Sequence, residues 1–189
     1  MADHLTAMRP APVATHHEDA AARIDSWWRL PSAAAADEAA RAALAAMPRA
    51  DGLLRFSVLR SPSEPLVFLQ SLWTSAAARE HYVRHVAASP RASVDDKVPG
   101  IERDRALTEV IGAVTIADAP AAKWVTRRLP GTDVRALAER ELARLRTEPG
   151  LVRVAAGAGE GEVVVVEEWA ASASPDGVFY EPVGAVAPA

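Results

Sequence analysis

The side chains best suited to chemistry are clustered between residues 69 and 91. Trp73 ends a strand-like run, and the pattern that follows predicts a helix over 75–88. At about 100° per residue, Tyr82 shares an apolar face of that helix with several aliphatic residues, and Arg79 falls near the centre of the face. A guanidinium beneath the helix could bind the phenolate, enolate or carboxylate of a ligand. It could equally lie across apolar surface as a snorkelling side chain.

Two histidines of the same helix are spaced as metal ligands can be, because His81 and His85 are one helical turn apart. His85 lies at the border of the apolar face, and we expect it to contact an organic ligand rather than a metal. The chain has no cysteine, which excludes disulfides, thiolate catalysis and thiolate metal ligands. The histidines of the segment HHED at 16–19 are expected to be solvated. We expect no metal and no other cofactor.

The run that ends at Trp73 has a counterpart about half the chain away. LVFLQSLW at 66–73 and EVVVVEEW at 162–169 are both strand-like and both end in tryptophan. The tripeptide RLP occurs twice, at 29–31 and 128–130. The segment GLLR at 52–55 is likewise similar to GLVR at 150–153. Such self-similarity predicts two copies of one structural unit.

Each copy can be divided into elements from its periodicity and its proline, glycine and capping residues. In the first copy we predict strands over 23–30, 53–60, 65–73 and 107–116, a helix capped by Ser32, and the helix over 75–88. In the second we predict strands over 123–129, 151–156, 162–169 and 180–186 and one helix capped by Thr132. The order β-α-β-β-α-β is that of a ferredoxin-like unit, and the second copy lacks its second helix.

The fold predicted is therefore α+β, with two ferredoxin-like repeats in one chain whose open sheets cover each other. We place a flexible leader at 1–20, the repeat with the functional cleft at 21–118, and a truncated, structural repeat at 119–189. The irregular segment 89–104 is the natural lid or entrance of the cleft.

The segments GLLRFSVLR at 52–60 and VFLQSLWTS at 67–75 resemble the antibiotic biosynthesis monooxygenase family. This resemblance implies a dimeric α+β barrel and a cofactor-independent monooxygenase that acts on an aromatic polyketide or a similar phenolic or quinol intermediate. Trp73 matches the pocket tryptophan of the family, and Arg91 lies in a segment similar to the one that follows the family's helix. The asparagine credited in the family with substrate activation is replaced here by Leu69, and by Val165 in the second copy.

Because successive side chains of a strand point to opposite faces, alternation identifies further residues on the face of Trp73 and the equivalent residue in the second copy. Leu69 and Ser71 share the face of Trp73, and Trp28 lies on the more buried face of the first strand, opposite to Trp27. Glu167 occupies the position of Ser71 in the second copy, where no helix covers it, and we expect it to be solvated.

We therefore predict one cleft per chain, with Trp73 and Arg79 as catalytic residues. The predicted substrate-binding residues are Trp28, Leu69, Ser71, Tyr82, His85 and Arg91.

Composition limits the partners. The 21 basic and 25 acidic residues give a net charge of −4 with no basic block, so nucleic-acid binding is not expected. The first twenty residues lack the apolar core of a signal peptide, and no later run could span a membrane, which predicts a cytoplasmic protein. The expected partners are a small aromatic substrate and O2, with the chain a monomer containing an internal pseudo-dimer or a homodimer of such chains.

Three other functions remain open on the same fold. These are a polyketide cyclase or another non-oxygenase tailoring enzyme, a non-catalytic ligand-binding or stress-response barrel, and a haem-handling oxygenase that depends on His81 or His85.

Overall fold

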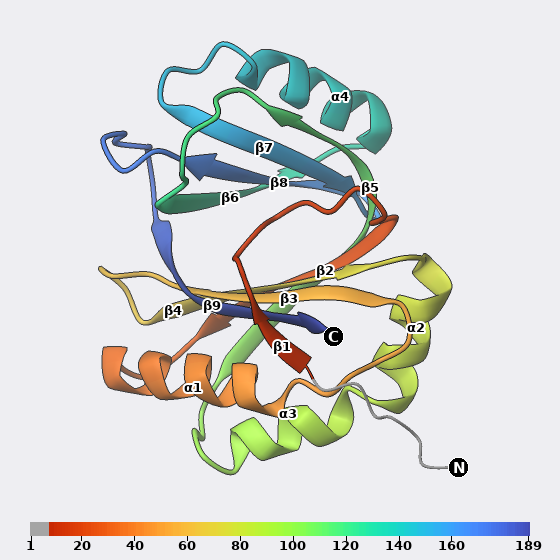
Figure 1. Cartoon of the computed structure of the whole chain (residues 1–189), viewed down its shortest axis with the longest axis vertical. Helices are drawn as coiled ribbons and strands as arrows, with labels where there is room; N and C mark the ends of the chain where they lie inside the picture. Colours follow the sequence, from red (N-terminus) through yellow and green to blue (C-terminus); the bar gives the residue numbers. More distant parts are fainter. Residues whose placement is uncertain (1–7) are drawn as a thin grey trace.

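The computed structural model of the protein describes residues 8–189, which form nine strands and four helices (Figure 1). The first unit consists of β2 (Ala22–Arg29), α1 (Ala33–Ala46), β3 (Leu53–Arg60), β4 (Leu66–Trp73), α2 (Ala76–His85), α3 (Ala88–Asp95) and β5 (Glu102–Thr115). The second consists of β6 (Lys123–Pro130), α4 (Val134–Leu145), β7 (Leu151–Ala158), β8 (Glu162–Trp169) and β9 (Phe179–Pro188). A short strand β1 (Met8–Ala11) precedes both units.

The two units have the same strand order. In the first the order is β3-β4-β2-β5, and in the second it is β7-β8-β6-β9, which in each case places the first strand between the third and the fourth. The fourth strand of each unit also pairs with the second strand of the other, because β5 pairs with β7 and β9 pairs with β3. These antiparallel pairings close the eight strands into a ring. The predicted α+β fold with two ferredoxin-like units is confirmed.

The helices lie on the outer faces of this ring, as Figure 1 shows, with α1, α2 and α3 over the first unit and α4 over the second. After β8 the chain reaches β9 without forming a helix, as predicted for the second unit. The helix face of the second sheet is therefore covered mainly by α4, whereas the first sheet has room for a cavity beneath three helices.

Two local predictions were wrong. The segment 89–104 is not irregular, since it contains most of α3 and the beginning of β5. Pro90 is tolerated in α3 because it lies in the first turn, where backbone N–H groups have no acceptor within the helix. The N-cap of α4 is Asp133 rather than Thr132, because the Asp133 carboxylate accepts a hydrogen bond from the Ala136 N–H at 3.1 Å.

The segment before β2 also differs from the predicted flexible leader. Met8–Ala11 forms β1 and pairs with the end of β9. Thr15 is buried and donates hydrogen bonds to the carboxylate of Glu168 through both its backbone N–H and its hydroxyl. Residues 1–7 lie outside the described residues.

The packing of α1 on the first sheet follows from its capping residue and its small side chains. Ser32 caps α1 as predicted, since its hydroxyl accepts from the Ala35 N–H at 3.1 Å. The small side chains on the buried face of α1 let the helix approach the first sheet closely; they are Ala36, Ala39, Ala40, Ala42 and Ala43. The ring interior holds a separate apolar cluster built around Phe68, Trp124 and Tyr180.

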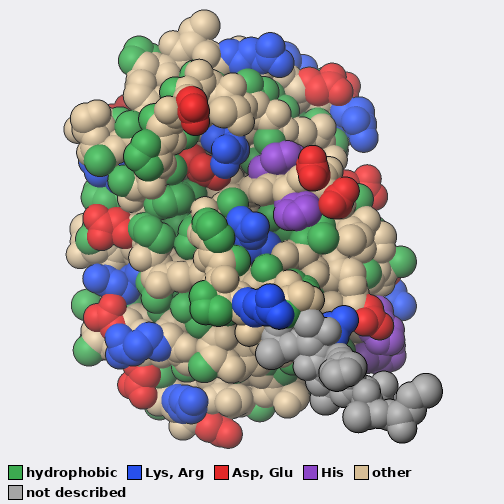
Figure 2. All heavy atoms as spheres, in the orientation of Figure 1, with side chains coloured by type: hydrophobic (Ala, Val, Ile, Leu, Met, Phe, Trp, Pro, Cys, Tyr) green, Lys and Arg blue, Asp and Glu red, His purple; other side chains and the backbone are tan. Residues whose placement is uncertain are grey.

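The distribution of charged side chains on the surface does not indicate a particular class of binding partner. On the face drawn in Figure 2, basic and acidic side chains are scattered rather than gathered into one block. Within residues 8–189, no helix is long and apolar enough to cross a membrane.

Candidate functional site

A cavity of about 280 Å³ lies between the outer face of the first sheet and the helices that cover it. Its floor consists of residues from four strands: Ile24, Ser26, Trp28, Phe56, Leu69, Ser71, Arg103, Asp104 and Arg105. Its walls and roof come from the three helices and the residues that follow them: Ala43, Ala46, Met47, Tyr82, Val83, Ala87, Pro90, Arg91 and Val94. Most of these side chains are apolar or aromatic.

Alternation along β2 and β4 explains the floor. Ser26 and Trp28 point toward the helices, whereas Trp27 points into the ring, where its ring centroid lies 5.6 Å from that of Phe68. The Trp28 indole N–H donates to Ser26 Oγ at 3.1 Å. Trp28 therefore presents an aromatic surface to the cavity while its polar atom already has a partner.

Tyr82 forms part of the roof from α2. Its hydroxyl lies 3.5 Å from the sulfur of Met47, and burial raises the pKa of the phenol above its ordinary value. A neutral phenol can donate a hydrogen bond to an oxygen atom of a bound ligand. The Tyr82 ring also packs against Trp73, with 4.9 Å between the ring centroids.

Trp73 lies behind the cavity wall rather than in it. The side chain is fully buried, and its indole N–H donates to Ser71 Oγ at 2.8 Å. Because Ser71 and Tyr82 both line the cavity and both contact Trp73, this tryptophan acts as a positioning residue for the two.

Arg79 is beneath α2, as the helical angle predicted, but it does not line the cavity. Its side chain is buried against β5, where Nη1 donates to the carbonyl oxygen of Thr108 at 2.7 Å. Burial lowers the pKa of its guanidinium. The geometry gives Arg79 a structural contact and no contact with a ligand in this cavity.

His85 is exposed and also lies outside the cavity. Its ring packs against that of His81 at a tilt of 46°, with 4.8 Å between the centroids. Within residues 8–189, no group of three or more His, Asp or Glu side chains is placed to hold a metal ion. Of the predicted site residues, the cavity thus brings together Trp28, Leu69, Ser71, Tyr82 and Arg91, and leaves out Trp73, Arg79 and His85.

Two arginines at the cavity were not among the predicted site residues. Arg103 and Arg105 belong to the first residues of β5, and the Arg103 guanidinium carbon lies 4.6 Å from the centroid of the Trp28 ring. Both were assigned to the irregular segment or left unassigned, because the strand was predicted to begin at 107. The signal was present in their i,i+2 spacing, which places both side chains on one face of a strand.

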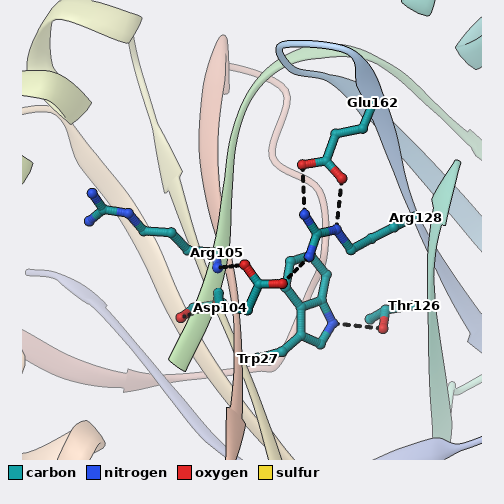
Figure 3. A network of polar contacts seen from close by, with 7 residues as sticks. Trp27, Asp104, Arg105, Thr126, Arg128 and Glu162 are labelled. Atoms are coloured by element: carbon teal, nitrogen blue, oxygen red, sulfur yellow. Dashed lines mark hydrogen bonds and ion pairs between the residues drawn. The ribbon is translucent and has the colours of Figure 1, made fainter. Parts of the chain in front are cut away.

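Asp104 is the one acidic residue of the lining, and Figure 3 shows that its carboxylate points away toward Arg128. Asp104 forms an ion pair with Arg128 of β6 and accepts from the Arg105 N–H at 2.7 Å. Arg128 is also bound by both carboxylate oxygens of Glu162, at 2.7 and 2.9 Å. The cavity therefore contains no free carboxylate or imidazole that could serve as a general base.

Comparisons with known proteins bear on the fold. No family model and no curated protein matches the sequence. Among solved structures, an anthrone oxidase-like protein aligns with a TM-score of 0.62 at 13% identity, covering 89% of this chain and 93% of that one. Candidate monooxygenases from Fusobacterium nucleatum and Lactobacillus acidophilus align with TM-scores of 0.55 and 0.54. Their sequences are 10% and 12% identical to this chain, respectively. Each alignment covers 89% of this chain, together with 95% of the Fusobacterium protein and 96% of the Lactobacillus protein.

The chain has the dimeric α+β barrel fold. At 10–13% identity, the likeness to these solved structures shows the fold and not the function.

The second half of this barrel differs from the first at the position of the cavity. Glu167, which corresponds to Ser71, was predicted to be solvated, and this was wrong because its side chain is fully buried. The Arg127 Nε donates to one of its oxygens at 2.6 Å, and the Trp169 indole donates to the other at 3.0 Å. Arg127, on the neighbouring strand, thus covers the carboxylate where the second helix is missing.

Proposed function

We propose that the protein is a monooxygenase-like tailoring enzyme that oxidises an aromatic polyketide or a similar phenolic or quinol compound, using O2 and no cofactor. The observation that carries the proposal is the aromatic cavity formed by Trp28, Phe56 and Tyr82, with arginines at its rim. Its place in an α+β barrel similar to an anthrone oxidase-like protein supports it further. The cavity volume of about 280 Å³ lies just below the range for small-molecule sites, which is about 300–1,000 Å³.

In this reaction the substrate itself supplies the electrons that reduce O2, so no cofactor is needed. An anthrone-type carbon that loses a proton becomes an electron-rich carbanion, which can pass one electron to O2. Recombination of the radical pair forms a C–O bond and, after proton uptake, a hydroperoxide. Loss of water then leaves a carbonyl group, so that one CH2 and one O2 give one C=O and one H2O.

The residues of the cavity would assist at defined points. Since no free base lines the cavity, the proton passes to water at the mouth, and the arginines favour the anion that remains. The Tyr82 hydroxyl donates a hydrogen bond to the substrate oxygen. The apolar walls hold substrate and O2 together.

The test is oxygen consumption with a hydroxylated anthrone, corrected for autoxidation, by protein treated with a chelator. Ala46→Phe fills the cavity from the end of α1, and Ala46→Ser at the same position leaves it open. We expect uptake by the wild type and by Ala46→Ser, and a loss of at least about tenfold in Ala46→Phe. Equal uptake by all three proteins would place any reaction outside this cavity.

The lack of a free base favours one second candidate, a non-catalytic ligand-binding barrel. That protein would bind the anthrone, with the same sensitivity to Ala46→Phe, but consume no oxygen above background. A cyclase would instead give a product without added oxygen, which mass spectrometry distinguishes. Neither His81 nor His85 lines the cavity, so its lining offers no imidazole ligand for haem iron.

A further inference from the structure

We propose that the ligand of this cavity carries a carboxylate, which binds at the rim to Arg103, Arg91 and Arg105 while its aromatic part lies on Trp28. This inference rests on the proposed function for the choice of cavity and names the class of substrate: aromatic acids rather than neutral arenes.

The first argument is the charge of the lining. Three arginines from α3 and β5 face the cavity, and its single carboxylate, Asp104, is bound to Arg128 on the other side of the strand (Figure 3). Among the described residues, neither Arg91 nor Arg105 forms an ion pair. The rim therefore has an excess of positive charge in a protein whose net charge is −4.

The second argument is the geometry of Arg103. One face of its guanidinium is stacked on the Trp28 ring, and Nη2 lies 2.7 Å from Asp95 Oδ1 of α3. Its Nε and Nη2 are buried, whereas Nη1 is not. A guanidinium held in one orientation by an aromatic ring and by Asp95 can donate a charge-assisted hydrogen bond from Nη1 to a ligand carboxylate.

The third argument sets the orientation of the ligand. Apart from the rim, the lining is apolar or neutral, and burying an unpaired charge there is costly. An aromatic acid can satisfy both regions only when its ring enters between Trp28 and Tyr82 and its carboxylate stays at the mouth. A neutral arene would fill the interior but leave the arginines without a partner.

Calorimetry with a matched pair of probes tests the inference. 2-Naphthoate and 2-naphthamide have nearly the same shape and differ in charge. We expect the wild type to bind the acid at least about tenfold more tightly, since a charge-assisted hydrogen bond is stronger than a neutral one; a factor of ten corresponds to about 1.4 kcal/mol. This preference should decrease as salt is added, because the rim is open to solvent.

Variants identify the residues responsible. Arg103→Gln should reduce the preference for the acid to less than about threefold, and the triple change with Arg91→Gln and Arg105→Gln should abolish it. Arg140→Gln removes an exposed arginine of α4 in the other unit and should change nothing. Equal binding of acid and amide by the wild type, binding of neither, or an equal loss in Arg140→Gln would each overturn the inference.

The failure of this inference can be separated from the failure of the proposed function. If the acid binds as expected but no hydroxylated aromatic acid promotes oxygen uptake, the carboxylate site stands and the oxygenase does not. If neutral anthrones are oxidised with the same kcat/KM as their carboxylated analogues, the oxygenase stands and the carboxylate site does not.

Discussion

The indole of Trp73 donates a hydrogen bond to Ser71, two residues earlier on the same strand, and Trp169 donates in the same way to Glu167. The shared geometry shows that the two hairpins are built alike. The two acceptors differ in charge, and the surroundings differ with them. A neutral hydroxyl lies at a cavity in the first unit, and a carboxylate bound by Arg127 lies in the second.

The Trp73–Ser71 hydrogen bond should make a measurable contribution to stability. Ser71→Ala leaves the indole N–H of a fully buried tryptophan without a partner, which costs about 1–3 kcal/mol. Urea unfolding of Ser71→Ala, Trp73→Phe and the double variant forms the appropriate cycle. We expect the loss from Ser71→Ala to be smaller in the Trp73→Phe background, and strictly additive losses would contradict a direct interaction.

The position of the missing asparagine provides a prediction of gained activity. Leu69→Asn places a side-chain amide in the floor of the cavity, where it can donate to a substrate oxygen, and we expect kcat to rise by about tenfold. Val165→Asn is the matched control, because Val165 is the equivalent residue of the second unit and is equally buried. A rise in both variants, or in neither, would argue against a direct role of this position.

Arg79 should behave as a structural residue. Arg79→Met removes the donor to the Thr108 carbonyl and should lower the free energy of unfolding by about 1–3 kcal/mol. Binding of an aromatic probe, measured below the unfolding range, should change by less than about twofold. A large loss of affinity in a folded Arg79→Met protein would restore the ligand-binding role that the helical pattern suggested.

These outcomes show which parts of the molecule can be predicted from sequence. The paired strands, the cap at Ser32 and the absent helix follow from local patterns, and all were predicted correctly. The helical angle placed Arg79 beneath α2, but an angle contains no information about position along the helix, and the cavity begins closer to its end at Tyr82.

The remaining errors have longer-range causes. Glu167 was expected to be solvated because no helix covers it. Its partner Arg127, which covers it instead, lies 40 residues away on a strand whose register could not be known from sequence. Pro90 and the charged residues after it resemble a loop, whereas packing against α1 stabilises α3. Arg103 and Arg105 were missed because β5 begins at Glu102, five residues before the predicted start of the strand at 107.

A buried carboxyl inside the barrel predicts an unusual dependence of stability on pH. Asp25 is fully buried beside Arg23, with Arg23 Nε 2.8 Å from Asp25 Oδ2, and desolvation raises the pKa of its carboxyl above the ordinary value of 3.8. The folded protein thus holds this proton more tightly than the unfolded chain. The contribution of Asp25 to stability is greatest below pH 3.8 and is lost as the pH rises through the folded pKa.

The comparison with Asp25→Asn isolates this effect from that of the other carboxylates. Relative to the variant, the wild type should gain stability as the pH is lowered, by up to about 1.4 kcal/mol per pH unit between the two pKa values. Denaturant unfolding at a series of pH values checks this. A difference that stays constant, or that falls toward low pH, would show that the ion pair with Arg23 outweighs the cost of burial.

The most direct test of the central claim is isotopic. A hydroxylated anthrone carrying a carboxylate is incubated under labelled oxygen gas with chelator-treated wild type, Ala46→Ser or Ala46→Phe, and the product is analysed by mass spectrometry. The account predicts one labelled oxygen in the product carbonyl, formed above the autoxidation rate by the first two proteins and not by the third. Label incorporation at the background rate in all three, with the substrate bound, would contradict it and leave the barrel as a binding protein.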